Sequence, residues 1–271
     1  CERGEVLGDP KDASVMAQVK ERQKEREKTA NLFRLREKLL FQEYPVENAA
    51  PDRGVKIGIP RVLSFWDTAP FWTTFLRSLG FQVQLSSPST RTIYESGLSA
   101  VTSDTVCFPA KLVHGHLRNL AKKGVDRIFM PSITTVPSEN MVDTSQSMCA
   151  VVKGYPFVIR NSDNPEERWN IPFDTPLFHW YTAKDREKQM TEYMEKTFRI
   201  PADETRRALE AGDRAMRSFH EQLKQAGKEV MDRVKEEGSF AVVLASRPYQ
   251  NDALVNHDLP EMFVSQGIPV V

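Results

Sequence analysis

The sequence is poor in cysteine and lacks a long apolar run. Its 271 residues include only three cysteines, too few for a disulfide scaffold and typical of a reducing compartment. No apolar run approaches ~18 residues, which argues against a transmembrane helix, and no signal-peptide pattern is present. We therefore expect a cytoplasmic protein with no membrane partner.

Charge of one sign is not in excess either. Lys+Arg and Asp+Glu both number 37, so the formal net charge is zero. This balance argues against a nucleic-acid partner or an anionic-membrane patch. Hydrophobic residues make up 40% of the chain, enough for a real core, and the length fits one large domain or two smaller ones.

The common cofactor motifs are missing. The absence of Cys-x-x-Cys argues against a zinc ribbon or a ferredoxin-type cluster run. There is also no Gly-x-Gly-x-x-Gly, no Walker loop and no Gly-x-Ser-x-Gly elbow. The sequence therefore does not predict binding of ATP or NAD by a standard loop.

Short β-branched runs alternate with helical patterns from residue 55 onward. They predict strands near 55–59, 81–85 and 127–130, and a further buried strand near 240–244. This alternation is typical of βαβ units with right-handed crossovers. We predict an α/β fold of Rossmann-like parallel-sheet lobes, with a long helical segment and an N-terminal helix.

The chain divides into four predicted parts. Residues 1–54 form a loop, a charged helix and a linker, and residues 55–160 form the first Rossmann-like α/β lobe. Residues 161–237 form a bridge that starts as a loop, because 162–176 is rich in Asn, Asp and Pro, and continues as helices over 184–237. Residues 238–271 read as the start of a second, truncated α/β lobe. The chain begins at a cysteine and ends on a strand-like run, so we expect a piece of a longer protein.

Two cysteines occur where thiolate chemistry is possible. Cys107 lies just before a helix predicted to run to about residue 123, and the amino end of a helix stabilises a thiolate. Such a thiolate can be a nucleophile or a soft metal ligand. Cys149 lies in a polar loop, and Cys1 cannot be interpreted from spacing. The alternative for Cys107 and Cys149 is a role as small buried hydrophobic residues.

Histidines and one polar loop are the other candidates. His114 and His116 are two residues apart on a predicted helix, which points them to different faces and disfavours a shared metal. Arg247, Asn256 and His257 follow the predicted strand near 240–244. Ligands in open α/β sheets bind outside the carboxyl ends of strands, so this loop is well placed. A polar turn organised by its Pro and Asp residues is the alternative.

Several segments, taken in order along the chain, carry a family resemblance. They resemble the uncharacterised region of large acyl-CoA dehydratase activase-related proteins, which are similar to 2-hydroxyglutaryl-CoA dehydratase activators fused to a dehydratase-subunit-like part. Residues 1–4 resemble the short segment that precedes this region. The segments are 56–63, 70–75, 103–116, 154–159 and 247–249 with 256–257.

The resemblance implies a cofactor and partners. Relatives of this region hold a [4Fe–4S] iron–sulfur cluster with cysteines, and Cys107, Cys149 and Cys1 match cysteine positions of the family. ATP would be bound only by actin-like domains that lie upstream and are absent here. The implied partners are other domains of the same longer chain and an acyl-CoA dehydratase-like protein or a CoA ester.

The final motif of the family departs from its usual pattern here. The resemblance makes Arg247, Tyr249, Asn256 and His257 candidate cofactor-binding residues, expected to line a cleft that faces Cys107. The motif usually has His, Pro and Gly at three positions that hold other residues in this chain. Those residues are Gln250, Ala253 and Asp258, so a role that needs an imidazole at position 250 is in doubt.

Three functions remain open from the sequence. The first is a fragment of an iron–sulfur, ATP-dependent electron-transfer protein, in which Cys107 and Cys149 approach each other as cluster ligands. The second is a non-catalytic interaction or scaffold domain. The third is a CoA- or phosphate-binding domain without a cluster. No reaction is assigned to the residues of this chain.

Overall fold

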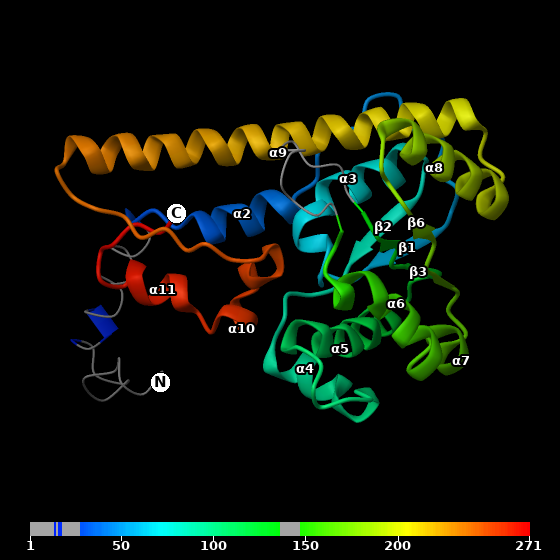
Figure 1. The fold of residues 1–271 in the computed structure, drawn as a ribbon, viewed down its shortest axis with the longest axis horizontal. Helices are drawn as coiled ribbons and strands as arrows, with labels where there is room; N and C mark the ends of the chain where they lie inside the picture. Colours follow the sequence, from blue (N-terminus) through cyan, green and yellow to red (C-terminus); the bar gives the residue numbers. More distant parts are fainter. Residues whose placement is uncertain (1–13, 15, 18–27, 136–146) are drawn as a thin grey trace.

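The computed structural model describes residues 14, 16–17, 28–135 and 147–271 (Figure 1). Cys1 and part of the charged N-terminal helix predicted over 11–43, namely residues 11–13, 15 and 18–27, lie outside the described residues. The carboxyl part of that prediction holds helix α2 (Leu32–Phe41), whose N-cap Asn31 accepts hydrogen bonds from the first-turn amides of Phe33 and Arg34.

The central sheet has four parallel strands in the order β2-β1-β3-β5. Ile57 pairs with Val83 on one side, and Gly58 pairs with Ile128 on the other. The three strands predicted near 55–59, 81–85 and 127–130 are therefore confirmed, and so is their parallel arrangement. The strands are β1 (Lys56–Ile59), β2 (Gln82–Leu85), β3 (Arg127–Phe129) and β5 (Phe173–Asp174). Beyond the central sheet, β4 (Ser132–Ile133) pairs with β6 (Leu177–Phe178), also in parallel.

The stretch 162–176, predicted as loop, contains a short helix and strand β5. The error has a simple cause, because prolines surround a strand of only two residues. Their carbonyls still serve the sheet: Pro172 accepts a hydrogen bond from the amide of Ile128, and Pro176 accepts one from Ser132.

Helices cover both faces of the sheet, giving a three-layer α/β/α arrangement (Figure 1). The chain moves from β1 to β2 in one direction and from β2 to β3 in the other, so right-handed crossovers place the connecting helices on opposite faces. One face carries α3 (Phe65–Ser78), α8 (Ala183–Phe198) and α9 (Ala202–Glu236); the other carries α4 (Arg91–Gly97), α5 (Phe108–Lys122), α6 (Ala150–Ser162) and α7 (Pro165–Trp169).

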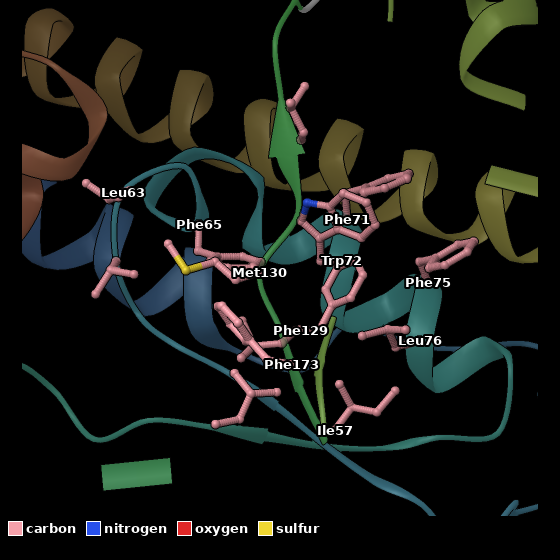
Figure 2. Packing of buried hydrophobic residues seen from close by; sticks show 14 of the residues in the cluster. Ile57, Leu63, Phe65, Phe71, Trp72, Phe75, Leu76, Phe129, Met130 and Phe173 are labelled. Carbon is pink, nitrogen blue, oxygen red and sulfur yellow. The ribbon is translucent and has the colours of Figure 1, made fainter. Parts of the chain in front are cut away.

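An aromatic core fills the space between the sheet and α3 (Figure 2). Trp72 is fully buried, and its ring lies 4.9 Å from the ring of Phe129 on β3. On the other face, a Cβ on Gly58 would lie 3.1 Å from Val125 and 3.2 Å from Leu120. Glycine at this position therefore lets α5 pack close to the strand, while the neighbouring isoleucines point toward α3.

The predicted helical segment over 184–237 is confirmed by α8 and α9, and no strand occurs in 205–235. Acidic residues Asp203 and Glu204 in the first turn of α9 favour its amino end. The long α9 runs past both α3 and α2 (Figure 1). One part of α9 therefore packs on α3, which covers the sheet, and another part packs on α2.

The prediction of a buried strand near 240–244 is wrong. Only Val242 forms a β-bridge, in parallel with Val270, and Phe240 and Val243 are 64% and 67% exposed. An apolar run is buried only when layers pack on both of its sides, and within the described residues one side of this run is open. The chain continues through η3 (Pro248–Asn251), α10 (Ala253–Asn256) and α11 (Leu259–Val264).

Candidate functional site at the carboxyl ends of the strands

Each of the two described cysteines begins a helix. Cys107 is the N-cap of α5, and its carbonyl accepts hydrogen bonds from the amides of Ala110 and Lys111. Cys149 is the N-cap of α6, and its carbonyl accepts one from Lys153. Neither thiol makes a capping hydrogen bond; Cys107 is exposed and Cys149 is half-buried, and both are free. Both sulfurs therefore lie at helix ends where unpaired backbone N–H groups favour negative charge.

The sheet topology places these helix starts at the same edge. Helix α5 leads into β3, and α6 leads through α7 toward β5. A crossover helix runs antiparallel to the parallel strands that it connects, so it begins at their carboxyl ends. In open α/β sheets, this edge is where ligands bind.

Tyr249 of η3 lies within electrostatic reach of both cysteines. Burial raises the pKa of the Tyr249 phenol, negative charge on Cys149 and on Cys107 raises it further, and the charge of Arg247 opposes this. The ring also packs against the core of the sheet and against the smaller cluster beneath α2. The fold thus brings Tyr249 of η3 within electrostatic reach of both thiols, although Tyr249 follows Cys149 by 100 residues in the sequence.

A buried hydrogen-bonded chain extends from Tyr155, which lies within electrostatic reach of Cys107. The Nε2 atom of His114 lies 3.1 Å from the Tyr155 hydroxyl, and its Nδ1 atom lies 2.7 Å from Oδ2 of Asp163. The carboxylate also forms ion pairs with Arg118 and Arg168. An ionised Asp163 fixes the proton of His114 on Nδ1, which leaves Nε2 to accept a hydrogen bond from Tyr155.

The charges in this chain shift two pKa values. Burial opposes ionisation of Asp163, but the hydrogen bond from His114 and the charge of Arg118 outweigh it and lower the pKa of the carboxyl. Burial, with negative charge at Cys107 and Asp163, raises the pKa of Tyr155 to about 12. Tyr155 therefore stays protonated at neutral pH, and its hydroxyl donates to Nε2 of His114.

A second buried chain joins the loop after β2 to η3 and α10. His116 lies 2.7 Å from Ser86 through Nδ1 and 3.0 Å from Ser89 through Nε2. The backbone amide of Arg61 donates to Ser86, and Ser89 donates to the buried carboxylate of Asp252. Burial, together with the charges of Arg61 and Lys123, lowers the pKa of His116 to about 3. His114 and His116 thus face different polar clusters, as their spacing predicts.

The predicted cofactor-binding residues lie in different surroundings. Arg247 lines a groove between α2 and α9, and Tyr249 lies near the cysteines. The Asn256 amide donates to the carbonyl of Gln250, while His257 is exposed and ends α10 with a positive φ of 55°. Cys1, the third predicted ligand, lies outside the described residues.

Tyr155 and Asp163 were not predicted from the sequence as neighbours of the candidate site. A usable signal existed for His114, since a histidine on the buried face of a helix needs buried hydrogen-bond partners. Their identity was not readable, because Tyr155 and Asp163 follow His114 by 41 and 49 residues.

The cysteine thiols are the right type of ligand for an iron–sulfur cluster, but the described residues supply too few of them. Thiolates are the usual ligands of such clusters, and four are usually needed. The described part of the chain supplies two thiols near Tyr249 and contains no group of three or more His, Cys, Asp or Glu side chains that could hold a metal ion. Cys107 and Cys149 can therefore be part of a ligand set that is completed elsewhere.

The fold and this edge define a Rossmann-like α/β domain whose helix-capping cysteines lie at the carboxyl ends of parallel strands. Residues 56–271 match the family described as CoA enzyme activase uncharacterised domain, and the chain belongs to that family. This confirms the resemblance to acyl-CoA dehydratase activase-related proteins. No curated protein and no solved structure matches the chain. No helix in the described ranges is long and apolar enough to span a membrane.

Proposed function

We propose that this domain supplies cysteine ligands to an iron–sulfur cluster in an ATP-dependent electron-transfer protein that acts on a CoA-ester dehydratase. Membership of the CoA enzyme activase family supports the relationship to dehydratase activators. The observation that carries the proposal is the pair of free thiols, Cys107 and Cys149, at the starts of two helices near Tyr249.

Each neighbouring residue has a specific task in this proposal. Cys107 and Cys149 would hold iron, and the backbone amides of α5 and α6 would stabilise their negative charge. When bound, the cluster would supply a one-electron donor and acceptor. Tyr155, whose hydroxyl donates to His114 and which burial keeps protonated, would place a neutral phenol within electrostatic reach of Cys107. Polar groups and charges around the ligand sulfurs tune the properties of a cluster.

The remaining ligands and the ATP-dependent step would come from elsewhere. Cys1 is the third ligand in this proposal, and other domains of a longer chain would hydrolyse ATP. The electron would pass to an acyl-CoA dehydratase-like protein. The rival functions, a scaffold domain or a CoA-binding domain without a cluster, require no iron at the cysteines.

Anaerobic purification of the whole protein tests the proposal. Iron, acid-labile sulfide and the electron paramagnetic resonance spectrum are measured for the wild type and for Cys107→Ser, Cys149→Ser and the double variant. We expect iron and sulfide to fall by half or more in each single variant. Thr105→Ala and Met148→Leu, which change residues beside the cysteines, should leave both values unchanged.

Two results would contradict the proposal. The first is a wild type without iron after anaerobic purification and reconstitution. The second is a double cysteine variant whose iron content equals that of the wild type. Thermal unfolding of the metal-free proteins serves as the folding control, because a merely structural role of the thiols would lower Tm without any dependence on iron.

A further inference from the structure

A groove of about 450 Å³ lies between α2, α9 and the segment 244–251. This volume falls within the roughly 300–1,000 Å³ of small-molecule pockets. Apolar side chains form most of the surface, among them Leu32 from α2, Leu223 from α9 and Leu244 from the segment that follows α9. Neither cysteine lines the groove, nor do Tyr155 and Tyr249, so a ligand here would have a separate role.

The charged residues of the groove are all basic. Arg36, Lys224 and Arg247 line it together with His220, and no lining residue is acidic. The Arg36 guanidinium lies 3.2 Å from Asp67 and donates to the carbonyl of Pro248. Lys224 and Arg247 have no ion-pair partner among the described residues, which leaves two cations available to an anion.

Gly227 lines the groove, although close packing does not require a glycine at this position. A Cβ on Gly227 would meet only Leu32 Cδ1, at 3.7 Å, an ordinary contact. In the same helix, a Cβ on Gly212 would lie 2.6 Å from the ring of Phe71, so close packing explains that residue. Glycine in a helix interior costs about 1 kcal/mol relative to alanine. At position 227 this cost has no compensation in packing, but it leaves space in the wall of the groove.

We propose that the groove binds an anionic amphiphile, a ligand with a short apolar chain and a carboxylate or phosphate head group. The chain would lie against Leu32, Leu223 and Leu244, in the space that Gly227 leaves open. The head group would be held by Lys224 and Arg247. This proposal is independent of the cysteine site and stands or falls separately.

Calorimetric titration of the whole protein with matched eight-carbon probes tests the ligand chemistry. We expect octanoate or octyl phosphate to bind at least about tenfold more tightly than octanol, and octyltrimethylammonium to bind worst of all. Octanoyl-CoA, compared with octanoate and with CoA alone, shows whether the chain arrives as a free acid or as a thioester. Equal affinity for the anionic, neutral and cationic probes, or no binding of any probe, would overturn the proposal.

Variants of the groove locate the site. Gly227→Leu should weaken binding of the anionic probes by about tenfold or more because the new side chain fills the groove, whereas Gly227→Ala should bind nearly as the wild type does. Replacing Lys224 and Arg247 together by Gln should remove the preference for octanoate over octanol. Both side chains are exposed, so this variant decides the matter even if Gly227→Leu fails to fold. Unchanged selectivity in it, or tight binding only of an acidic apolar peptide, would count against a small-molecule site.

Discussion

The Nδ1 atom of His114 lies 2.7 Å from Oδ2 of Asp163, and both side chains are completely buried. The pair joins α5 to the end of α6, and Arg118 and Arg168 complete the surroundings of the carboxylate. Gly115, next to His114, lets α4 pack closely on α5, since a Cβ there would lie 2.0 Å from the carbonyl oxygen of Ile93 in α4. On this face of the sheet, α5 therefore contacts α6 through a buried charge and α4 through a close backbone approach.

We expect Asp163→Asn to destabilise the protein. The substitution keeps the shape but removes a buried negative charge that accepts hydrogen bonds from His114 and Arg118. Hydrogen bonds to charged groups are each worth about 1.5–3 kcal/mol, so the free energy of unfolding should fall by about 2–3 kcal/mol. Urea unfolding of the wild type and the variant at neutral pH measures the difference.

Arg168→Gln is the matched control for this prediction. It removes an ion pair to the same carboxylate from a side chain that is 46% exposed. Exposed ion pairs contribute about 0–1 kcal/mol, so this variant should lose far less than Asp163→Asn. Equal losses in the two variants would show that the buried hydrogen bond to His114 is not what stabilises the layer.

Stability should also fall as the pH is lowered from about 6.5 toward 3. His116 has a folded-state pKa of about 3 against an ordinary value of 6.5, so the folded protein excludes a proton that the unfolded chain takes up. The contribution of neutral His116 to the free energy of unfolding is fully present above pH 6.5 and is lost as the pH falls from 6.5 to about 3. Linkage gives a loss of up to about 1.4 kcal/mol per pH unit within that window.

Asp252 opposes this trend, so a variant must isolate the effect of His116. Burial raises the pKa of Asp252, and its stabilising contribution is therefore lost as the pH rises. Because Ser89 joins the two side chains, the Asp252 term is removed by measuring the difference in free energy of unfolding that His116→Gln makes in an Asp252→Asn background. We expect this difference to shrink steadily from pH 6.5 to 4.5. A pH-independent difference would mean that His116 is not held neutral by burial.

Local sequence patterns predicted those helices and strands that are long enough to show a periodic pattern of apolar residues or clear residues at their ends. The run 56–59 is β-branched and ends at Pro60, and α5 has Pro109 in its first turn and ends before Gly124. Strand β5 has two residues between prolines and depends on its neighbour β3, so no local pattern could identify it. The exposure of Phe240 depends on what packs against it, which is a tertiary property.

The same limit applies to the candidate site. The position of Cys107 at a helix start was readable from the proline two residues later, and the structure has that helix start. The position of Cys149 at the start of α6 was not, because Pro156 lies inside that helix and the segment before it reads as irregular. Asp163 is followed by Asn and Pro, a pattern typical of an exposed turn, yet its side chain is fully buried against His114.

Two glycines of α9 should respond in opposite ways to the same substitution. Gly212→Ala places a Cβ 2.6 Å from the Phe71 ring and 3.0 Å from its carbonyl oxygen, so the aromatic core must shift. Overpacking of this kind costs about 1–3 kcal/mol, which outweighs the gain in helix propensity. Gly227→Ala meets only Leu32, at 3.7 Å, and should stabilise the protein by up to about 1 kcal/mol.

Thermal and urea unfolding of the two alanine variants test this contrast, and helix propensity alone cannot produce it, because both residues lie inside the same helix. If both variants were stabilised, α9 would not pack against Phe71 as closely as described. If both were destabilised, the space at Gly227 would already be filled, and the groove between α2 and α9 would have no room for an apolar chain. Opposite signs would establish that Gly212 serves packing and that Gly227 does not.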